Sequence, residues 1–463
     1  MISLDIKKAL KILGYNDLTV VQEKVIPKLI NYKSIVVKSQ TGSGKTASFS
    51  IPICENIDIN NEVQALIIVP TRELSIQVSN EISNIGIVKK IRSEAIYGKS
   101  KIKEQINSLK QRVQVIVSTP GRLIDLINRE AIDLSNLKYL IIDEADKMLN
   151  KGFIDDMKFL FDNVNDNVTV GLFSATFDQN VESFSNKYIK NFDKIEIEKV
   201  KNESLIDEKL LMTKDKYDSL KKVIFSKNPT TTLVFVNTKD MATKLFRRLK
   251  KDKFNARELS GDMSQEKRIF TINDFKDRKF NVLVSTDVAS RGIHIDEIDL
   301  VINYDVPRDT ENYVHRIGRT GRYKSSGVAV SIHEENELKY VKEIEEYIGK
   351  EIEYLEDFDK EELSQLEKAF LSKKVGFVKE VKDEIFEITK IYLNCGKRKK
   401  IRNVDILGAL NNIDGIENSD IGVIKITDDC SYVDILNHKA NIIIKKREII
   451  IKRRTVKVRK DRG

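Results

Sequence analysis

The chain has 463 residues, of which 41% are hydrophobic and 33% charged, and its formal net charge is +9. This composition supports several folded domains and excludes a disordered chain. No stretch approaches the roughly 18 uninterrupted apolar residues of a membrane span. Three cysteines supply neither a disulfide framework nor paired metal ligands. The amphipathic start lacks the features of a secretion signal, so we expect a cytoplasmic protein without membrane contact.

Much of the positive charge lies at the C-terminal end. Residues 380–463 contain 19 Lys and Arg against 13 Asp and Glu, a net charge of +6, which leaves +3 for the rest of the chain. A basic end on a nearly balanced body is typical of polyanion binding. A solvated, lysine-rich surface explains the composition equally well.

Short apolar runs alternate with segments of helical spacing in two series. The first series comprises residues 34–37, 65–70, 113–120, 139–146 and 170–176, and the second comprises 231–238, 281–287, 300–307 and 328–333. Such runs indicate parallel strands covered by helices on both faces. We therefore expect two open α/β domains, residues 1–202 and 203–355, with ligands at the carboxyl ends of their strands.

The remainder of the chain predicts a third, smaller domain. Residues 356–379 are expected to form a linker, and residues 380–463 to form a domain. Its expected order is β-α-β-β-α-β, with strands at 384–394, 422–427, 431–436 and 448–460 and helical segments at 404–413 and 439–446. This order is typical of an α+β sandwich of the RNA-recognition-motif (RRM) kind.

The stretch SQTGSGKT, residues 39–46, follows an apolar strand and precedes a helix. Backbone N–H groups of such a glycine-rich turn cradle phosphate oxygens at a helix N-terminus. In this P-loop, Lys45 would reach the β/γ-phosphates, and the Thr46 hydroxyl would bind Mg²⁺. The predicted ATP-binding residues of the loop are Ser39, Thr41, Gly42, Ser43, Gly44, Lys45 and Thr46.

Two carboxylates follow the apolar run YLII in the segment YLIIDEAD. Asp143 would hold Mg²⁺, and Glu144 would orient and deprotonate the attacking water. A lone acidic cluster is usually a solvated surface, but this one follows a buried strand downstream of a P-loop.

The segment HRIGRTGR, residues 315–322, lies in the second predicted domain. Three arginines and a histidine exceed what a structural loop needs. Guanidinium groups suit a γ-phosphate whose charge redistributes during transfer, so Arg319 and Arg322 are candidate arginine fingers. An ordinary polyanion-binding patch is the alternative. ATP would be enclosed only when the two domains close.

Together these motifs resemble those of the DEAD-box RNA helicases over nearly the whole chain. The nucleotide-side motifs of that family appear at residues 14–22, 39–46, 143–146, 174–176 and 315–322, and its RNA-side motifs at 70–74, 119–122, 265–268 and 285–293. The resemblance implies that the two α/β domains are RecA-like. It also implies an ATP-dependent enzyme that separates short RNA duplexes locally.

The resemblance also implies roles for single residues. Gln22 would read the adenine edge, and Tyr15 would pack beside the base. Four residues would link the nucleotide to the RNA groove: Asp146, Ser174, Thr176 and His315. Six would line the path of one RNA strand: Arg72, Thr119, Gly121, Arg122, Arg268 and Thr286. Their contacts would be mainly with sugar and phosphate, so this part of the enzyme would not read sequence.

Three features depart from the family pattern. The chain begins too late to supply the aromatic residue that precedes the adenine motif. Leu18 replaces the usual proline, and His294 replaces an aspartate, although Asp296 lies two residues on. These departures concern base stacking and ribose contacts, and they leave the phosphate chemistry intact.

The end of the chain resembles the RNA-binding domain of DbpA-like helicases over residues 392–437. That resemblance implies a helicase that binds a 23S rRNA hairpin in pre-50S particles during assembly of the large ribosomal subunit. We expect a monomer, although the sequence does not reveal the oligomeric state. Only Tyr432 occupies the strand where an RRM carries aromatics, so we expect weak base stacking on the sheet. The expected contacts are instead Lys397, Arg398, Lys399, Lys400 and Arg402. The basic run at 452–460 is a second candidate surface, or a basic fringe without function.

Two other functions stay open at this point. A translocating DNA helicase of the wider P-loop group would be stimulated equally by single-stranded DNA. An RNA-binding assembly scaffold with a vestigial ATPase would bind RNA without turnover. Intact Glu144, Arg319 and Arg322 argue against the scaffold.

Overall fold

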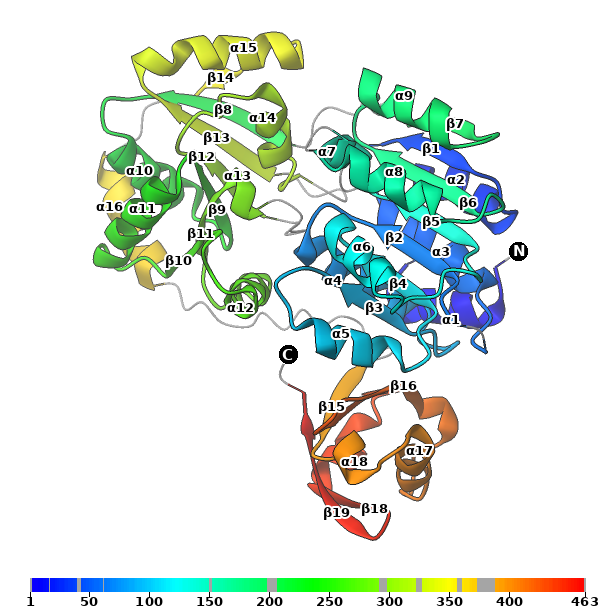
Figure 1. Cartoon of the computed structure of the whole chain (residues 1–463). Coiled ribbons are helices and arrows are strands. Elements are labelled where there is room, and N and C mark those ends of the chain that lie inside the picture. Colours follow the sequence, from blue (N-terminus) through cyan, green and yellow to red (C-terminus); the bar gives the residue numbers. More distant parts are fainter. Residues whose placement is uncertain are drawn as a thin grey trace. The chain divides into compact units, whose positions relative to one another are not determined.

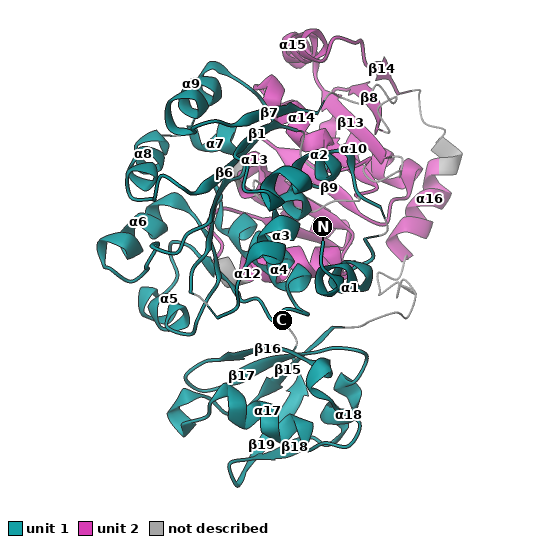
Figure 2. Ribbon diagram, turned by 90° about the vertical axis from the view of Figure 1, so that its right-hand side faces the viewer, with its two compact units in different colours: residues 1–197, 381–463 teal, residues 198–380 magenta. Residues whose placement is uncertain are grey.

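The computed structural model describes residues 2–15, 17–39, 43–60, 62–149, 152–197, 206–290, 298–321, 327–355, 360–372 and 388–461. Contacts within the chain define two compact units, Met1–Ile197 with Val381–Gly463 and Glu198–Glu380 (Figure 2). Most helices and strands of both are labelled in Figure 1.

The first unit contains a seven-stranded parallel sheet in the order β3-β4-β2-β5-β6-β1-β7. Its strands are β1 (Ile35–Lys38), β2 (Ala65–Ile68), β3 (Ser93–Ile96), β4 (Val115–Ser118), β5 (Tyr139–Ile142), β6 (Thr169–Ser174) and β7 (Asp193–Glu196). The helices are α1 (Leu4–Ile12), α2 (Val20–Ile30), α3 (Lys45–Asn56), α4 (Arg72–Ile85), α5 (Ile102–Leu109), α6 (Pro120–Asn128), α7 (Ala145–Leu149), α8 (Ile154–Asp162) and α9 (Gln179–Tyr188). Successive strand residues enter two different apolar cores, as Val36 and Val37 do, so helices cover both faces of the sheet.

The second unit repeats this architecture with the order β10-β11-β9-β12-β13-β8-β14. Its strands are β8 (Ile206–Met212), β9 (Thr232–Val236), β10 (Ala256–Leu259), β11 (Val282–Thr286), β12 (Leu300–Asn303), β13 (Gly327–His333) and β14 (Glu353–Tyr354). The helices are α10 (Lys216–Lys227), α11 (Lys239–Lys251), α12 (Gln265–Lys276), α13 (Asp287–Ser290), α14 (Thr310–Ile317), η1 (Glu335–Glu337), α15 (Leu338–Ile348) and α16 (Lys360–Ser372).

Part of the segment expected to be a linker is a packed helix. Helix α16 falls inside residues 356–379, and its Phe370 is 2% exposed. The centroid of the Phe370 ring lies 5.9 Å from the ring centroid of Phe225 and 5.7 Å from that of Phe254. Burial of these aromatic rings ties the helix to the second unit, so this part of the segment does not act as a free tether.

The C-terminal residues form a five-stranded antiparallel sheet in the order β16-β17-β15-β19-β18. Its elements are β15 (Thr389–Leu393), η2 (Lys397–Lys399), α17 (Asn403–Asn411), η3 (Asn418–Asp420), β16 (Ile421–Ile426), β17 (Ser431–Ile435), α18 (Ala440–Lys445), β18 (Glu448–Ile451) and β19 (Arg454–Lys460). Helices α17 and α18 supply Ile406, Leu410 and Ile443 to the core of this sheet. The expected fold class, two parallel α/β sheets followed by an α+β domain, is confirmed.

One expected strand of this domain is a hairpin. Residues 448–460 form β18 and β19 with a turn at Lys452 and Arg453, whose φ angles are +48° and +61°. Two consecutive residues with positive φ define the tight turn that matches the twist of paired strands. In the described part of the chain, no helix has the length and apolarity required to span a bilayer.

Candidate functional site

The carboxyl edge of the first sheet separates two groups of predicted residues. The P-loop follows β1, the DEAD segment follows β5, and the SAT segment begins at the end of β6, so the nucleotide-side groups follow the neighbouring strands β5-β6-β1. The predicted RNA-side residues follow the neighbouring strands β4 and β2. The predicted ATP-side and RNA-side groups therefore lie next to each other at one edge, where an open α/β sheet binds its ligands.

The described part of the P-loop is anchored to the adjacent strand. The Ser39 N–H donates to the Ser174 carbonyl oxygen at 2.9 Å, and Lys45 Nζ donates to the Ser39 carbonyl oxygen at 2.9 Å. Lys45 begins helix α3 and is 7% exposed. A buried ammonium group at a helix N-terminus provides the positive environment that phosphate requires. Two predicted loop residues, Thr41 and Gly42, lie outside the described residues.

Gly44 precedes α3 with a φ of +90°, a conformation that favours glycine. A Cβ atom at this position would lie 2.6 Å from Gln22 Nε2. Gln22 is 1% exposed; its Nε2 donates to the Gly44 carbonyl oxygen, and its Oε1 accepts from the Thr19 N–H. Gln22, predicted to read adenine, therefore also supports the phosphate loop. This connection was not anticipated from sequence.

The DEAD segment places its carboxylates in a buried site. Asp143 is 3% exposed, and its Oδ1 accepts a hydrogen bond from the Glu144 N–H at 2.9 Å. Glu144 has a φ of +54°, a backbone conformation that costs a non-glycine residue about 1–3 kcal/mol and is concentrated at functional sites. Glu144 Oε1 lies 3.0 Å from Lys147 Nζ. Burial raises the pKa of the Asp146 carboxyl group, while Lys147 and Lys45 oppose this rise.

Ser174 lies at the end of β6, and its side chain is fully buried. Within the described residues, its Oγ has no hydrogen-bond partner. A buried hydroxyl without a partner is costly, which suggests that a partner is supplied in another state of the site. Thr176, two residues further on, is partly exposed.

The RNA-side residues of the first unit occupy the starts of two helices. Arg72 opens α4, while Thr119 is the N-cap of α6 and Gly121 lies in its first turn. A Cβ at Gly121 would meet no atom within 4 Å. Arg122 is held inward, because its Nη1 donates to Gln105 Oε1 at 2.6 Å.

The second unit shows the same division at its carboxyl edge. Arg268 on α12 and Thr286 at the end of β11 belong to the β10-β11 side of the sheet. His315 and Arg319 lie in and directly after α14, which follows β12. Arg319 is 8% exposed. Its predicted companion, Arg322, lies outside the described residues, as do His294 and Asp296.

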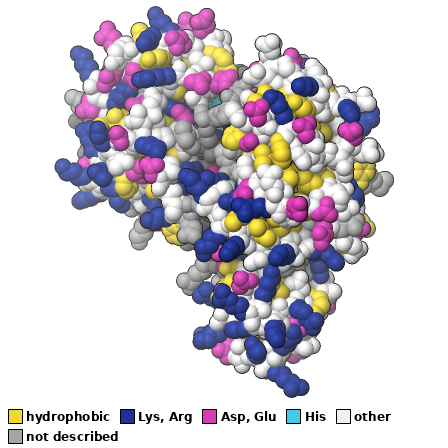
Figure 3. All heavy atoms as spheres, viewed as in Figure 1, with side chains coloured by type: hydrophobic (Ala, Val, Ile, Leu, Met, Phe, Trp, Pro, Cys, Tyr) yellow, Lys and Arg dark blue, Asp and Glu magenta, His cyan; other side chains and the backbone are white. Residues whose placement is uncertain are grey.

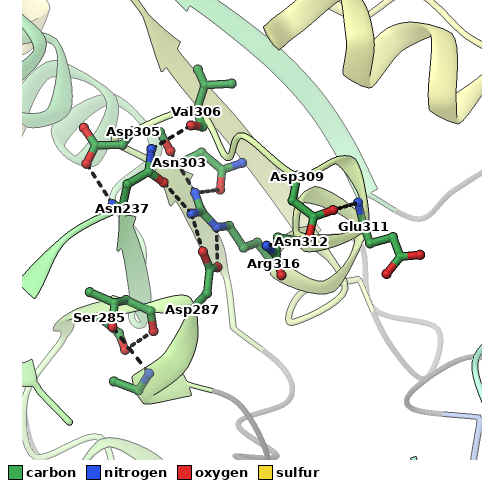
Figure 4. Close-up of polar contacts among 12 residues, drawn as sticks. Asn237, Ser285, Asp287, Asn303, Asp305, Val306, Asp309, Glu311, Asn312 and Arg316 are labelled. Carbon is green, nitrogen blue, oxygen red and sulfur yellow. Dashed lines mark hydrogen bonds and ion pairs between the residues drawn. The ribbon is translucent and has the colours of Figure 1, made fainter. Parts of the chain in front are cut away.

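Arg316 is a residue that the sequence did not single out. It is 1% exposed, and its guanidinium group contacts Asp287, Asn237, Asn303 and the carbonyl oxygen of Asp305 (Figure 4). Arg316 is one of the three arginines judged from the sequence to exceed what a structural loop needs. Its guanidinium group is in fact fully hydrogen-bonded inside the domain. In the sequence, Asn237 and Asp287 directly follow two apolar runs that form buried strands. Polar residues at such positions indicate a polar cluster, so they could have pointed to the role of Arg316.

The C-terminal sheet carries an aromatic pair that the sequence did not reveal. Tyr392 on β15 lies opposite Tyr432 on β17, with ring centroids 5.8 Å apart. The guanidinium carbon of Arg459 on β19 lies 4.2 Å from the centroid of the Tyr392 ring. These three side chains occupy the face opposite the buried residues Ile391 and Val433. Strand β17 carries Tyr432 as its one aromatic residue, as expected, and cross-strand pairing brings Tyr392 of β15 beside it.

The predicted basic residues lie in the connection from β15 to α17. Arg398, Lys399, Lys400 and Arg402 are exposed, and Lys397 is partly exposed. Arg398 pairs with Asp429 at 2.8 Å, but both side chains are about 70% exposed and such pairs are weak. Figure 3 shows further Lys and Arg side chains over the visible surface of the C-terminal domain. This surface suits a polyanion.

Three family models match the chain. The DEAD/DEAH box helicase model covers residues 19–184, the helicase conserved C-terminal domain covers 215–324, and the DbpA RNA binding domain covers 390–460. Each model covers most strands of one of the three sheets described above, whereas β7, β8, β13 and β14 lie outside the matched residues.

Similar proteins match over most of the chain. It is 43% identical over 453 residues to the ATP-dependent RNA helicase DbpA of Bacillus subtilis, covering 96% of this chain and 94% of that protein. It is 40% identical to the ATP-dependent RNA helicase CshA of Limosilactobacillus reuteri over 342 residues, covering 73% and 69%. The solved structure of S. cerevisiae Dbp5 bound to RNA and ADP BeF3 gives a TM-score of 0.70 at 30% identity, covering 80% of this chain and 98% of that one.

The chain therefore belongs to the DEAD-box family and is an ATP-dependent RNA helicase. Its two parallel sheets are the RecA-like domains of this family. The C-terminal domain is a DbpA RNA-binding domain, so the chain is a helicase of the DbpA type.

Proposed function

We propose that this helicase acts on 23S rRNA in pre-50S particles during assembly of the large ribosomal subunit, in the cytoplasm and as a monomer. The observation that carries this proposal is the DbpA-type domain with its sheet row Tyr432, Tyr392 and Arg459 and its exposed basic connection. Aromatic faces hold unpaired bases, and the basic connection holds phosphates. A hairpin with an open loop offers both unpaired bases and closely spaced phosphates.

In the helicase core, we propose that ATP is bound by the P-loop and split by a water molecule that Glu144 orients. Lys45 and Arg319 would stabilise the negative charge of the γ-phosphate, with Arg322 as a second finger. The hydroxyl of Thr46 and the carboxylate of Asp143 are hard oxygen donors, which suit Mg²⁺. Mg²⁺ when bound would neutralise phosphate charge, with its remaining ligands from phosphates and water.

The RNA-side residues would hold one strand through its backbone. Arg72, Thr119, Gly121, Arg122, Arg268 and Thr286 would make these contacts, which carry no sequence information. Specificity would therefore come from the C-terminal domain. The alternative of a vestigial ATPase is disfavoured by the buried Lys45, Asp143 and Glu144.

ATP turnover by the full-length protein tests this proposal. It should be measured with 23S rRNA, its hairpin fragment, an unrelated RNA of equal length and single-stranded DNA. We expect 23S rRNA and its hairpin fragment to stimulate ATP turnover half-maximally at much lower concentrations than the unrelated RNA does. Equal half-maximal concentrations for all RNAs would contradict the targeting, and equal stimulation by DNA would contradict the RNA preference.

Neutralising four lysine and arginine side chains tests the basic connection. The change of Lys397, Arg398, Lys399 and Lys400 to Gln should weaken binding of the hairpin. Each lost phosphate contact should lower the slope of log affinity against log salt by about 0.7–0.9. An unchanged slope would show that these side chains do not contact phosphates.

A further inference from the structure

Arg316 is the largest fully buried side chain in the described part of the chain. Its five N–H donors all have acceptors. Nε and Nη2 donate to the two carboxylate oxygens of Asp287 at 2.6 and 2.7 Å, and Nη2 also donates to Asn237 Oδ1 at 2.9 Å. Nη1 donates to Asn303 Oδ1 at 3.3 Å and to the Asp305 carbonyl oxygen at 2.8 Å.

These partners come from different parts of the sheet edge. Asn237 follows β9, Asp287 follows β11, and Asn303 and Asp305 lie at the end of β12, whereas Arg316 itself lies on α14 (Figure 4). Strands β11, β9 and β12 are consecutive in the sheet. The guanidinium group therefore spans the boundary between the strands that lead to the RNA-side residues and the strand that leads to α14.

On the RNA side, Asp287 begins the short helix α13 directly after Thr286. Thr286 Oγ1 accepts a hydrogen bond from the Ala289 N–H at 3.4 Å, and Arg268 Nη2 donates to the Ala289 carbonyl oxygen at 2.9 Å. Both predicted RNA contacts of this unit are thus attached to the helix whose first residue pairs with Arg316. On the other side, the N–H of Arg319 donates to the carbonyl oxygen of Arg316 at 3.2 Å.

A buried ion pair is a weak way to increase stability, since desolvation opposes the attraction between the charges. A five-donor planar fork with every donor occupied instead fixes relative geometry. We infer that Arg316 is a positioning residue that makes the RNA-side turn at Thr286–Asp287 and the ATP-side turn at Arg319 move as one body. This inference rests on the roles of Thr286 and Arg319 proposed above, and it gives Arg316 a part in the coupling of RNA binding to ATP binding.

The experiment measures that coupling directly. The affinity of the full-length protein for a non-hydrolysable ATP analogue is determined without RNA and with saturating single-stranded RNA. The ratio of the two affinities is the coupling factor, commonly about 5–150-fold. A loss of folded protein changes the fraction of active molecules but not this ratio, so the ratio separates positioning from general destabilisation.

Arg316→Lys keeps a positive charge but supplies three donors from one point instead of a planar fork with five. We expect its coupling factor to fall to within about twofold of unity, and that of Asn237→Ala to fall part of the way. Arg308→Lys, at an exposed arginine on the same connection, is the control and should keep the wild-type factor. A folded Arg316→Lys protein with the wild-type factor overturns the inference.

If Arg316→Lys does not fold, the coupling factors of Asn237→Ala and Asp287→Asn test the inference instead. Each of these variants keeps Arg316 but removes one of the hydrogen-bond acceptors of its guanidinium group. Wild-type coupling in both variants overturns the inference. Absence of coupling in the wild-type protein instead contradicts the proposed function on which the inference rests, so the two failures are distinguishable.

Discussion

The backbone N–H of Ser39 donates a hydrogen bond of 2.9 Å to the carbonyl oxygen of Ser174. Strands β1 and β6 are paired in parallel, with Lys38 opposite Ser174, so this bond extends their ladder into the P-loop. The P-loop and the SAT segment are therefore joined through the backbone. The buried Ser174 Oγ lies at this point and has no hydrogen-bond partner among the residues that the structure describes.

Glu144→Gln should bind ATP and RNA but hydrolyse ATP about 10²–10⁴-fold more slowly, because the amide cannot accept the proton of the attacking water. The substitution leaves in place Asp143, proposed to hold Mg²⁺, and Lys45, proposed to contact the phosphates. Single-turnover hydrolysis and ATP-analogue binding are the measurements. Glu104→Gln, at an exposed glutamate, is the control. Near-wild-type hydrolysis by Glu144→Gln would remove Glu144 from the catalytic role.

Gly44→Ala should weaken ATP binding and lower the free energy of unfolding. A φ of +90° is unfavourable for alanine by about 1–2 kcal/mol, and the new Cβ would contact Gln22 Nε2. Nucleotide titration and denaturant unfolding measure the two effects. Gly152→Ala shares the positive φ, +81°, but its Cβ would meet no atom within 4 Å. If the free energy of unfolding falls equally in Gly44→Ala and Gly152→Ala, the contact with Gln22 does not contribute to the destabilisation.

Arg319→Ala should reduce RNA-stimulated ATP hydrolysis by about 10³-fold or more if Arg319 is an arginine finger. ATP binding without RNA should change little, because the P-loop is untouched. The comparison is with Arg308→Ala, which removes an exposed arginine near the start of the same helix. Stimulated turnover at the wild-type rate in Arg319→Ala would leave Arg319 with a packing or RNA-binding role.

Tyr392→Ala should weaken binding of the 23S hairpin, since loss of one stacked base costs about 1–3 kcal/mol. Fluorescence titration with the hairpin measures this loss. Val404→Ala provides the control, because Val404 is 64% exposed on α17 and lies away from the aromatic face. If Tyr392→Ala binds the hairpin as tightly as Val404→Ala does, the sheet face does not stack bases and the basic connection alone holds the RNA.

The stability of the protein should depend on Glu81 between about pH 4.5 and pH 7. Burial raises the pKa of Glu81 from 4.5 to about 7, although the Tyr15 hydroxyl donates to its Oε1 at 3.2 Å. In this range the folded state retains a proton that the unfolded state releases, so the free energy of unfolding falls as pH rises. The fall is at most about 3 kcal/mol.

Glu81→Gln should remove this part of the pH dependence and stabilise the protein at pH 8. Denaturant unfolding at pH 5, 6, 7 and 8 provides the measurement, with Glu104→Gln as an exposed control. A wild-type pH profile in Glu81→Gln would show that another group titrates.

The central strands and the phosphate loop could be predicted from the sequence, whereas the edge strands could not. Strands β1, β2, β4, β5 and β6 are buried on both faces and therefore read as continuous apolar runs. The edge strands β3 and β7, with sequences SEAI and DKIE, have neighbours on one side only and tolerate polar residues. Backbone pairing with a neighbouring strand places β3 and β7 in the sheet. Such pairing does not require an apolar run, so the sequence does not reveal these strands.

The same contrast holds for the sites. The P-loop is local, since its glycines, lysine and following helix are adjacent in sequence, and the sequence therefore determined this chemistry by itself. The partnership of Tyr392 with Tyr432 depends on the register of two antiparallel strands that are distant in sequence. The role of Arg316 depends on three strand ends meeting at one point of the sheet. Only the tertiary structure decided these, because non-local contacts are set by strand order and register.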